Sequence, residues 1–320
     1  MSKKILAICL ILSVLLCAFV SCDDKDKKKS GAKNKTSISG NEYIPDDVGP
    51  YSQGLAYEIS SDRTYYKVKG VGSCTDTQIS IPPTYEGLAV KEIGFAAFGA
   101  TYLSSNSVSV VKEITIPNSV EKIGEGAFAN NKYLTKIKFG GYVQSIANSA
   151  FRNCENITEV HIKSLEKWCM INFESWTSSP FYESKNAKLY LNNKLVEDVS
   201  INKATEIKQY AFYGCTTIKN VTLGDSVTAI GDGAFYNCDS LSVITIGKNV
   251  SKIGCNAFTS CDVLRNAVFK DPEKWYTLKV LSSSPSDIIE VPSSDLKNSN
   301  TAAQYVEETY TFSYWEKSKK

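Results

Sequence analysis

The chain repeats one pattern of apolar and polar residues. In "VTLGDSVTAIGDGAFYNCDSLSVITIGKNVSKIGCNAFTSC" (residues 221–261), an Ile-Gly pair is followed, after two residues, by an Ala-Phe pair, and the phrase occurs twice. The phenylalanines of such pairs along the chain are Phe98, Phe128, Phe151, Phe212, Phe235 and Phe258. Three intervals between neighbours in this series are 23 residues long. A fixed period in the twenties is typical of a solenoid.

One unit of the repeat predicts one coil. In residues 241–264, Leu241, Ile244 and Ile246 alternate around Thr245, as in a short strand. Val250, Ile253, Phe258 and Cys261 then return the chain to Leu264, where the next strand starts. A unit of this size cannot enclose its own apolar side chains, so neighbouring coils must bury them together. The sequence therefore predicts an α/β-type repeat solenoid with short parallel strands.

The consensus of the units is L-x-x-I-x-I-P-x-S-V-x-x-I-G-x-x-A-F-x-x-C, visible in "VKEITIPNSVEKIGEGAFANN". This pattern resembles the BspA-like leucine-rich repeat, also called the Treponema pallidum type. The resemblance extends over about residues 55–268. It implies a leucine-rich repeat fold and a lipid-anchored surface protein that acts as an adhesin.

Two departures from the repeat divide the chain. Phe151 and Phe212 are 61 residues apart, which we interpret as one unit of 23 and an excess of 38. The excess predicts an aromatic insertion at about 163–194 that interrupts a solenoid spanning 54–290. Its "EKW" recurs in "KDPEKWYTLKVLSSSP", where the solenoid should end. A solenoid needs capped ends: "GLAYEISSDRTYYKVKG" predicts an N-terminal capping hairpin, and residues 291–320 predict a C-terminal cap with a short helix from about Thr301 and an extended aromatic tail.

The N-terminus has the features of a bacterial export signal. Two lysines precede the apolar run "ILAICLILSVLLCAFV" of 16 residues, which is shorter than the ~20 that a spanning helix needs. The following "FVSC" resembles a bacterial lipobox, which implies that residues 1–21 are a lipoprotein signal peptide and that Cys22 carries the lipid. An uncleaved anchor is the alternative. Residues 22–53 are polar and predict a flexible tether. We therefore expect an exported protein, lipid-anchored to the outer membrane and displayed on the cell surface.

The cysteines follow the repeat. Ten are present, and four lie three residues after a repeat phenylalanine: Cys154, Cys215, Cys238 and Cys261. Asn131 and Thr101 take the same place in other units, so we interpret this position as a structural ladder and not as a chemical site. Cys74, Cys169 and Cys255 lie outside the ladder, and a disulfide involving one of them stays open.

The sequence contains no recognisable motif for catalysis or for cofactor binding. There is no C-x-x-C pair, His161 is the single histidine, and no G-x-S-x-G or phosphate-binding glycine motif occurs. We expect no enzyme, no catalytic residue, no metal and no small-molecule cofactor, with a hydrolase as a remote alternative. The formal net charge of +2 gives no indication of a nucleic-acid partner.

Two groups of residues are candidates for ligand binding. The outward mid-strand positions should stack into one polar, lightly basic stripe: Thr115, Lys138, His161, Ser200, Thr222 and Thr245. Alternatively, these residues are ordinary strand formers on a solvent-exposed face of the sheet. His161 should be a solvated surface residue. In the insertion, Trp168 and Trp176 could anchor a ligand or cover the flank of the solenoid.

Two functions fit these features. The first is a surface adhesin whose partners are host extracellular-matrix proteins or bacterial surface proteins. The second is a periplasm-facing scaffold that organises envelope proteins. Asp23 after Cys22 would favour inner-membrane retention in some bacteria, so the sequence leaves the side of the membrane open.

Overall fold

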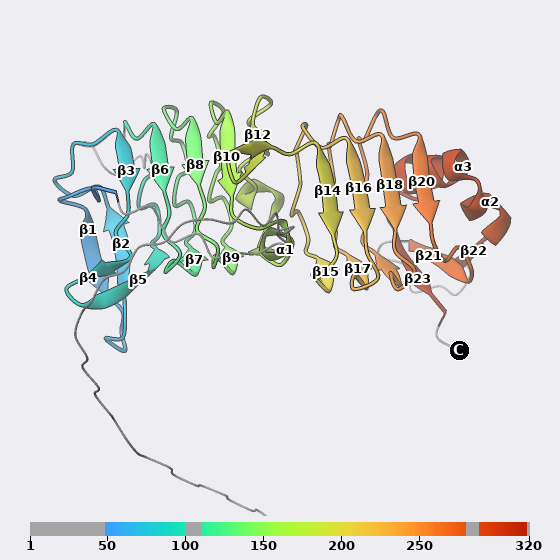
Figure 1. Cartoon of the computed structure of the whole chain (residues 1–320), viewed down its shortest axis with the longest axis horizontal. Coiled ribbons are helices and arrows are strands. Elements are labelled where there is room, and N and C mark those ends of the chain that lie inside the picture. Colours follow the sequence, from blue (N-terminus) through green and yellow to red (C-terminus); the bar gives the residue numbers. More distant parts are fainter. Residues whose placement is uncertain (1–48, 100–109, 280–287, 319–320) are drawn as a thin grey trace, which may run out of the picture. The chain divides into compact units, whose positions relative to one another are not determined.

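The computed structural model describes residues 49–99, 110–279 and 288–318. These residues belong to one unit of the chain. The predicted signal peptide, Cys22, most of the predicted tether and Thr101 lie outside the described residues. Within the described part, the chain forms a solenoid whose coils each contribute one strand to a front sheet and another strand to a separate sheet (Figure 1).

The front strands are parallel and form two separate sheets. The first contains β3 (Gln78–Ser80), β6 (Glu113–Thr115), β8 (Lys136–Lys138), β10 (Glu159–Ile162) and β12 (Lys188–Leu191), with β13 (Lys194–Leu195) antiparallel at its edge. The second contains β14 (Asp198–Ile201), β16 (Asn220–Leu223), β18 (Val243–Ile246) and β20 (Asn266–Phe269).

The strands outside the front sheets likewise fall into two groups. The first group is β5 (Leu88–Ile93), β7 (Lys122–Ile123), β9 (Ser145–Ile146) and β11 (Asn172–Phe173). The second is β15 (Glu206–Ile207), β17 (Ala229–Ile230) and β19 (Lys252–Ile253). The α/β-type repeat solenoid with parallel strands is thus confirmed.

Phenylalanine rings form the centre of the core. Phe128 and Phe151 lie 5.0 Å apart between ring centroids, and Phe212 and Phe235 lie 5.2 Å apart, with ring planes within 10° of parallel. All four are buried. The 23-residue period is the length that returns the chain to this stack, so each coil covers the apolar side of the previous one.

Both ends of the solenoid carry caps, as the sequence predicts. At the N-terminal end, β1 (Ala56–Ile59) and β2 (Tyr66–Gly70) form an antiparallel hairpin, and β2 runs parallel to β5. The short β4 (Thr84–Tyr85) pairs antiparallel with the start of β5. These strands occupy the edge that would otherwise be open to another chain.

At the C-terminal end, three strands and a helical segment close the last coil. The strands are β21 (Trp275–Lys279), β22 (Ile288–Val291) and β23 (Ser313–Lys317), and β23 pairs antiparallel with β19. The helices are α2 (Ser293–Lys297), α3 (Ser299–Gln304) and a π-helical turn at Tyr305–Thr309. Trp275 and Trp315 are buried against Phe269 of the last front strand.

The insertion differs from the expected single excess of 38 residues. Phe181 lies 30 residues after Phe151 and 31 before Phe212, and it is buried like the other repeat phenylalanines. The 61 residues therefore form two coils, each lengthened by several residues. The first contains α1 (Leu165–Cys169), β11 and a 3-10 turn at Trp176–Ser178, and the second is extended by the β12–β13 hairpin. Pro180 replaces the alanine of the usual Ala-Phe pair, which hides this unit in the sequence.

The junction between the two front sheets is held by side chains instead of a strand ladder. The Glu166 carboxylate in α1 accepts hydrogen bonds from the backbone amides of Asn202, Lys203 and Ala204 at 2.6–3.1 Å. The Trp168 indole donates to the Ala211 carbonyl at 2.7 Å.

In the second "EKW", Glu273 instead pairs with Lys297, and Trp275 lies at the start of β21. The Glu-Lys-Trp sequence therefore has different contacts in the insertion and in the C-terminal cap.

Candidate binding face

The first front sheet presents two outward ladders on either side of a buried one. Ile114, Ile137, Val160 and Leu189 pair with one another and point into the core. Because side chains alternate across a strand, the flanking residues point outward. We call the first set the charged ladder: Gln78, Glu113, Lys136, Glu159 and Lys188. We call the second set the His161 ladder: Ser80, Thr115, Lys138, His161 and Tyr190.

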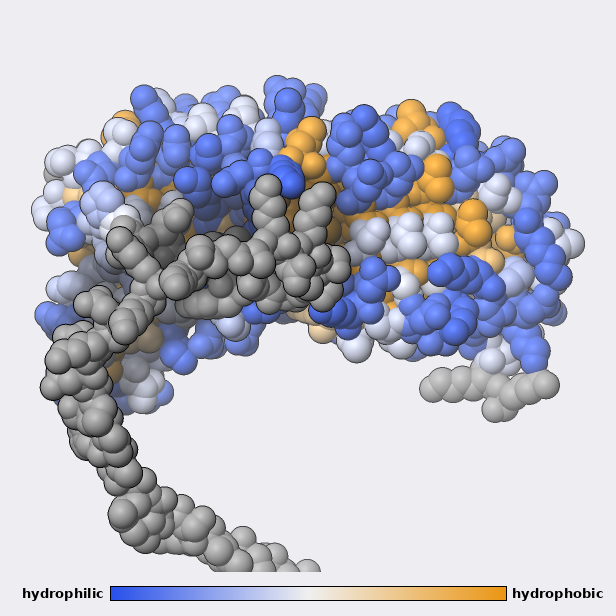
Figure 2. Space-filling model, in the orientation of Figure 1, coloured by the Kyte–Doolittle hydropathy of each residue, from blue (hydrophilic) through white to orange (hydrophobic). Residues whose placement is uncertain are grey.

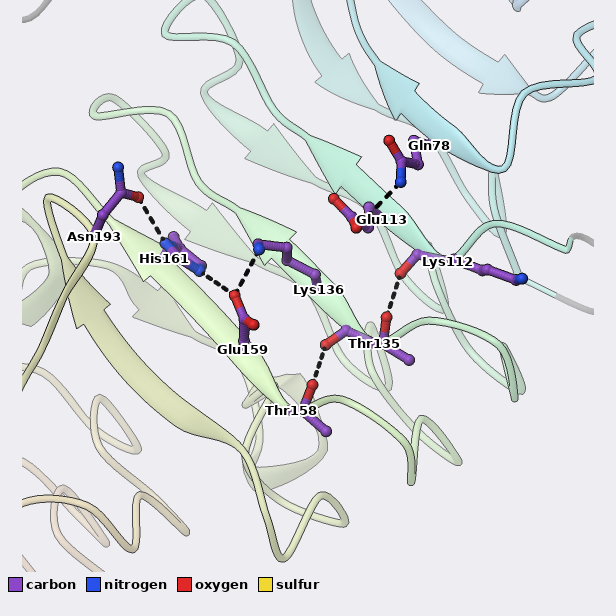
Figure 3. A network of polar contacts seen from close by, with 9 residues as sticks. All are labelled: Gln78, Lys112, Glu113, Thr135, Lys136, Thr158, Glu159, His161 and Asn193. Carbon is purple, nitrogen blue, oxygen red and sulfur yellow. Dashed lines mark hydrogen bonds and ion pairs between the residues drawn. The ribbon is translucent and has the colours of Figure 1, made fainter.

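Four members of the charged ladder form pairs with one another (Figure 3). Lys136 Nζ lies 2.7 Å from Glu159 Oε2, and Gln78 donates to Glu113 at 3.3 Å. The hydrogen bond from Lys136, followed by that from His161, lowers the pKa of Glu159, and the same bond raises the pKa of Lys136. Directly opposed residues of opposite charge stabilise a sheet. These contacts therefore join coils, whereas Lys188 of β12 is exposed and forms no ion pair among the described residues.

His161 is held on three sides, unlike the solvated residue expected from sequence. Its Nε2 lies 2.8 Å from Glu159 Oε2, and its Nδ1 lies 3.2 Å from Asn193 Oδ1 (Figure 3). The ring stacks on Tyr190 at 4.7 Å, and its side chain is only 12% exposed. The sequence interpretation was wrong because the β12–β13 hairpin adds a strand beside β10, which covers the ring.

A row of hydroxyls ties the starts of the front strands together. Thr158 donates to the carbonyl of Thr135, and Thr135 donates to that of Lys112, both at 3.1 Å (Figure 3). Ser242 makes the equivalent bond to Lys219 in the second sheet. Each bond links residues one coil apart, so these hydroxyls support stacking of the coils.

Lys138 is the charged residue of the His161 ladder that lies open to solvent. Its side chain is exposed, and across the described ranges it forms no ion pair, whereas Lys136 beside it is paired. Thr115 lies directly opposite it on the neighbouring strand. A lysine without an internal partner keeps its three donors available to a bound molecule.

The second front sheet has a different surface chemistry. Its outward ladder consists of small hydroxyl residues ending in an exposed valine: Ser200, Thr222, Thr245 and Val268. Over β14–β20, Figure 2 shows a band of pale and orange residues bordered by blue ones. The expected single stripe is therefore two ladders. They are separated because β12 and β14 belong to different sheets.

The two tryptophans of the insertion have opposite environments. Trp168 is 2% exposed and packs edge-on against Phe139 and Phe173, so the prediction that it could contact a ligand fails. It covers the interior of the solenoid instead. Trp176 is 49% exposed and is free to contact a ligand.

The cysteine ladder has a defined hydrogen-bond role. The thiols of Cys154, Cys238 and Cys261 donate to the carbonyl of the repeat phenylalanine one coil earlier at 3.0–3.2 Å. Asn131 donates to Phe98 in the same way. Cys and Asn exchange at this position because both can donate. Cys215, which follows the lengthened coil, instead contacts the Thr217 hydroxyl at 3.6 Å.

All seven described cysteines are free thiols, including Cys74, Cys169 and Cys255. Burial raises the pKa of Cys154 to about 12 and that of Cys215 to about 11. Across the described ranges, no group of three or more His, Cys, Asp or Glu side chains could hold a metal ion. In the same part of the chain, no helix has the length and apolar character needed to cross a membrane.

Residues that the sequence analysis missed come from the β12–β13 hairpin. Tyr190 and Asn193 complete the surroundings of His161. The signal was present in "KLYLNNKL", because an Asn-Asn pair between short alternating runs predicts a two-residue hairpin. Asn192 and Asn193 have φ of 51° and 63°, as such a turn requires.

The repeat also identifies the family. The family model of the BspA type leucine-rich repeat region matches six copies in residues 102–194 and 183–303. The chain belongs to this family. No curated protein matches the sequence. This BspA-type chain is 22% identical to a leucine-rich cell surface protein from Faecalibacterium prausnitzii, with a TM-score of 0.48 over 73% of this chain and 59% of the other.

Two further solved structures are similar to the BspA-type chain. The T. pallidum leucine-rich repeat protein is 20% identical, with a TM-score of 0.43 over 66% of this chain and 88% of that one. A leucine-rich repeat protein from Bacteroides ovatus is 20% identical, with a TM-score of 0.31 over 70% of this chain and 71% of that one. At these identities the likeness concerns the fold alone.

Proposed function

We propose that this protein is a cell-surface binding protein of adhesin type that recognises a protein partner on its front sheets. The observation that carries the proposal is Lys138, an exposed lysine without an ion-pair partner among the described residues, in the middle of the first front sheet. Leucine-rich repeat solenoids generally use such extended regular faces to bind other proteins.

The proposal includes export and a lipid anchor at Cys22. The apolar N-terminal run and "FVSC" support it, and one similar structure is that of a cell surface protein. Two or more acyl chains would hold the protein stably on a membrane. The polar residues that follow Cys22 would keep the solenoid at a distance from the lipid. Host extracellular-matrix proteins and surface proteins of other bacteria are the partner classes to screen.

Location is tested by protease treatment of intact cells, followed by immunoblotting of this protein and of a periplasmic control. Loss of the band while the control survives supports surface display. Protection until the outer membrane is opened contradicts the adhesin proposal, and the partner would then be an envelope protein. Replacement of Cys22 by Ser should release the protein from membranes. Continued membrane association of that variant would contradict the lipid anchor.

The binding face is tested with charge variants. Lys138→Glu should weaken binding of a partner found by the screen about tenfold or more, because it reverses the charge of this exposed side chain. Lys185→Glu is the matched control, since Lys185 is an exposed lysine of the loop before β12. Equal binding by both variants and the unmodified protein would contradict the assignment to the first front sheet.

A further inference from the structure

An aromatic groove lies outside the front sheets, where segments far apart in the sequence meet. Its volume is about 400 Å³, and five aromatic side chains and one carboxylate define it: Trp176, Tyr210, Tyr213, Asp232, Tyr236 and Tyr314. Trp176 comes from the insertion and Tyr314 from β23 of the C-terminal cap. The volume falls within the range of small-ligand sites.

Tyr210 occupies this groove in a strained backbone conformation. Its φ is 59°, in the left-handed region that bulky side chains avoid. The residue two positions before the repeat phenylalanine has a positive φ in five other coils as well, but there it is smaller: Ala96, Gly126, Ser149, Gly233 and Asn256. A tyrosine is therefore used at a position where other coils place small residues. Strain of this kind is typical of functional sites.

The rings form a connected surface. Tyr213 and Tyr236 stack at 4.7 Å with planes 5° apart, and Tyr210 meets Tyr213 edge-on at 5.8 Å. Trp176 lies edge-on to Tyr210 at 6.4 Å. Trp176 is 49% exposed and Tyr314 is 38% exposed, so the surface is open to solvent. Of these rings, Tyr210 packs against the buried core of the solenoid.

The groove is electronegative. Asp232 Oδ1 accepts the Cys255 amide at 3.0 Å, and Oδ2 accepts the Tyr314 hydroxyl at 3.4 Å. In the part of the chain that the structure describes, no lysine or arginine forms an ion pair with Asp232. The Asp232 charge, and then burial, raises the pKa of Tyr314. Burial first, and then Asp232, raises the pKa of Tyr210. The negative charge of Asp232 is thus unbalanced, and aromatic faces add to the attraction for a cation.

We propose that the aromatic groove binds a positively charged side chain, arginine above all, on a peptide segment of a partner protein. The guanidinium group is planar, stacks on aromatic faces and pairs with carboxylates. Arginine and aromatic residues are also enriched at binding hot spots. A neutral carbohydrate fits less well, because it cannot balance the negative charge of Asp232. This site is separate from the front sheets, so its test does not depend on theirs.

The protein offers a built-in probe of the groove. Of its four tryptophans, Trp168, Trp275 and Trp315 are buried, and only Trp176 is exposed. Protein labelled with fluorotryptophan should give four fluorine NMR resonances, and Trp176→Phe assigns the one from the groove. The purified protein would be titrated with acetyl-Gly-Arg-Gly-amide. The matched peptide with citrulline has nearly the same shape without the charge, and lactose tests a neutral sugar.

We expect the arginine peptide to shift the Trp176 resonance saturably, with a Kd of about 1 mM for so small a probe. The citrulline peptide should bind at least about tenfold more weakly, and added salt should weaken the arginine peptide. Asp232→Asn keeps an oxygen for the Cys255 amide and should lower affinity about tenfold. Equal binding of the two peptides, a shift by lactose alone, or no movement of the Trp176 resonance would overturn the proposal.

Tyr210→Gly separates binding from folding. Glycine accepts the left-handed conformation, as Gly126 and Gly233 show in other coils, so relief of strain should offset part of the packing lost with the ring and the variant should stay folded. Binding of the arginine peptide should nevertheless fall about tenfold or more, because the ring is removed. A Tyr210→Gly protein that binds the peptide as well as the unmodified protein would contradict the proposed role of the groove.

Discussion

The thiol of Cys238 donates a hydrogen bond to the carbonyl oxygen of Phe212, 3.2 Å away and 26 residues earlier in the chain. The same bond joins Cys261 to Phe235 and Cys154 to Phe128. The cysteine thus contacts the coil before its own, beside the stacked phenylalanine rings. Since coils of a solenoid contact only their neighbours, these bonds contribute to the interface terms that hold the array together.

Removal of one thiol should weaken this interface. Cys238→Ala loses the donor and leaves a small cavity, which should lower the free energy of unfolding by about 1–2 kcal/mol. Cys238→Asn supplies the amide donor that Asn131 uses in another coil, and it should cost less. Chemical denaturation followed by circular dichroism measures both. If the alanine variant were as stable as the unmodified protein, the Cys238 hydrogen bond would not contribute to the stability of the stacked coils.

The buried thiols should not react in the folded protein. Burial raises the pKa of Cys154 to about 12 and raises that of Cys238 well above its ordinary value. Thiolates are the reactive form, so iodoacetamide at pH 8 should leave both unmodified. Cys74 is the one described cysteine that is not buried and should react first. Mass spectrometry counts the modified sites, and concentrated guanidinium chloride should expose all seven described cysteines.

The Glu159 contacts predict a dependence of stability on pH. Because Lys136 and His161 hold the pKa of Glu159 below its ordinary value of 4.5, its contribution is present above that value and is lost as the pH falls through the lowered pKa. Glu159→Gln should lower stability at neutral pH by less than ~1 kcal/mol, since the carboxylate is partly exposed. The difference should vanish in strong acid.

Thermal unfolding across pH checks the Glu159 prediction. Glu155→Gln serves as the control, because Glu155 is exposed and has no hydrogen bond or ion pair in the described part of the structure. A constant difference between Glu159→Gln and the unmodified protein at all pH values would contradict the assigned electrostatic contribution.

The two tryptophans of the insertion should respond differently to substitution. Trp168→Phe removes the hydrogen bond to the Ala211 carbonyl and part of a buried ring, at a cost of about 2 kcal/mol. Trp176→Phe changes a half-exposed ring and should stay within about 0.5 kcal/mol of the unmodified protein. Denaturant midpoints measure both. Equal effects would mean that the junction between the two front sheets does not depend on Trp168.

Within the solenoid, prediction succeeded where the signal was local. The 23-residue spacing of Phe212, Phe235 and Phe258 predicts one coil per unit, because each coil buries the same residues as the next. It failed at Phe181, where a proline replaces the alanine and two lengthened coils appear as one insertion. The sequence predicted six members of the outward ladder but missed Tyr190, and it did not predict the division of the ladder into two sheets. That division depends on which strand β12 joins.

By itself, then, the sequence determined the repeat, the buried faces of its strands, the structural position of the ladder cysteines and the need for two caps. These follow from alternation and period, which one unit already displays. Only the tertiary structure decided that Tyr190 and Asn193 cover His161, that Trp168 is buried, and that Trp176 meets Tyr210 and Tyr314 in one groove. These contacts join residues from different coils and from the C-terminal cap. Their positions depend on how the lengthened coils stack, which no single repeat encodes.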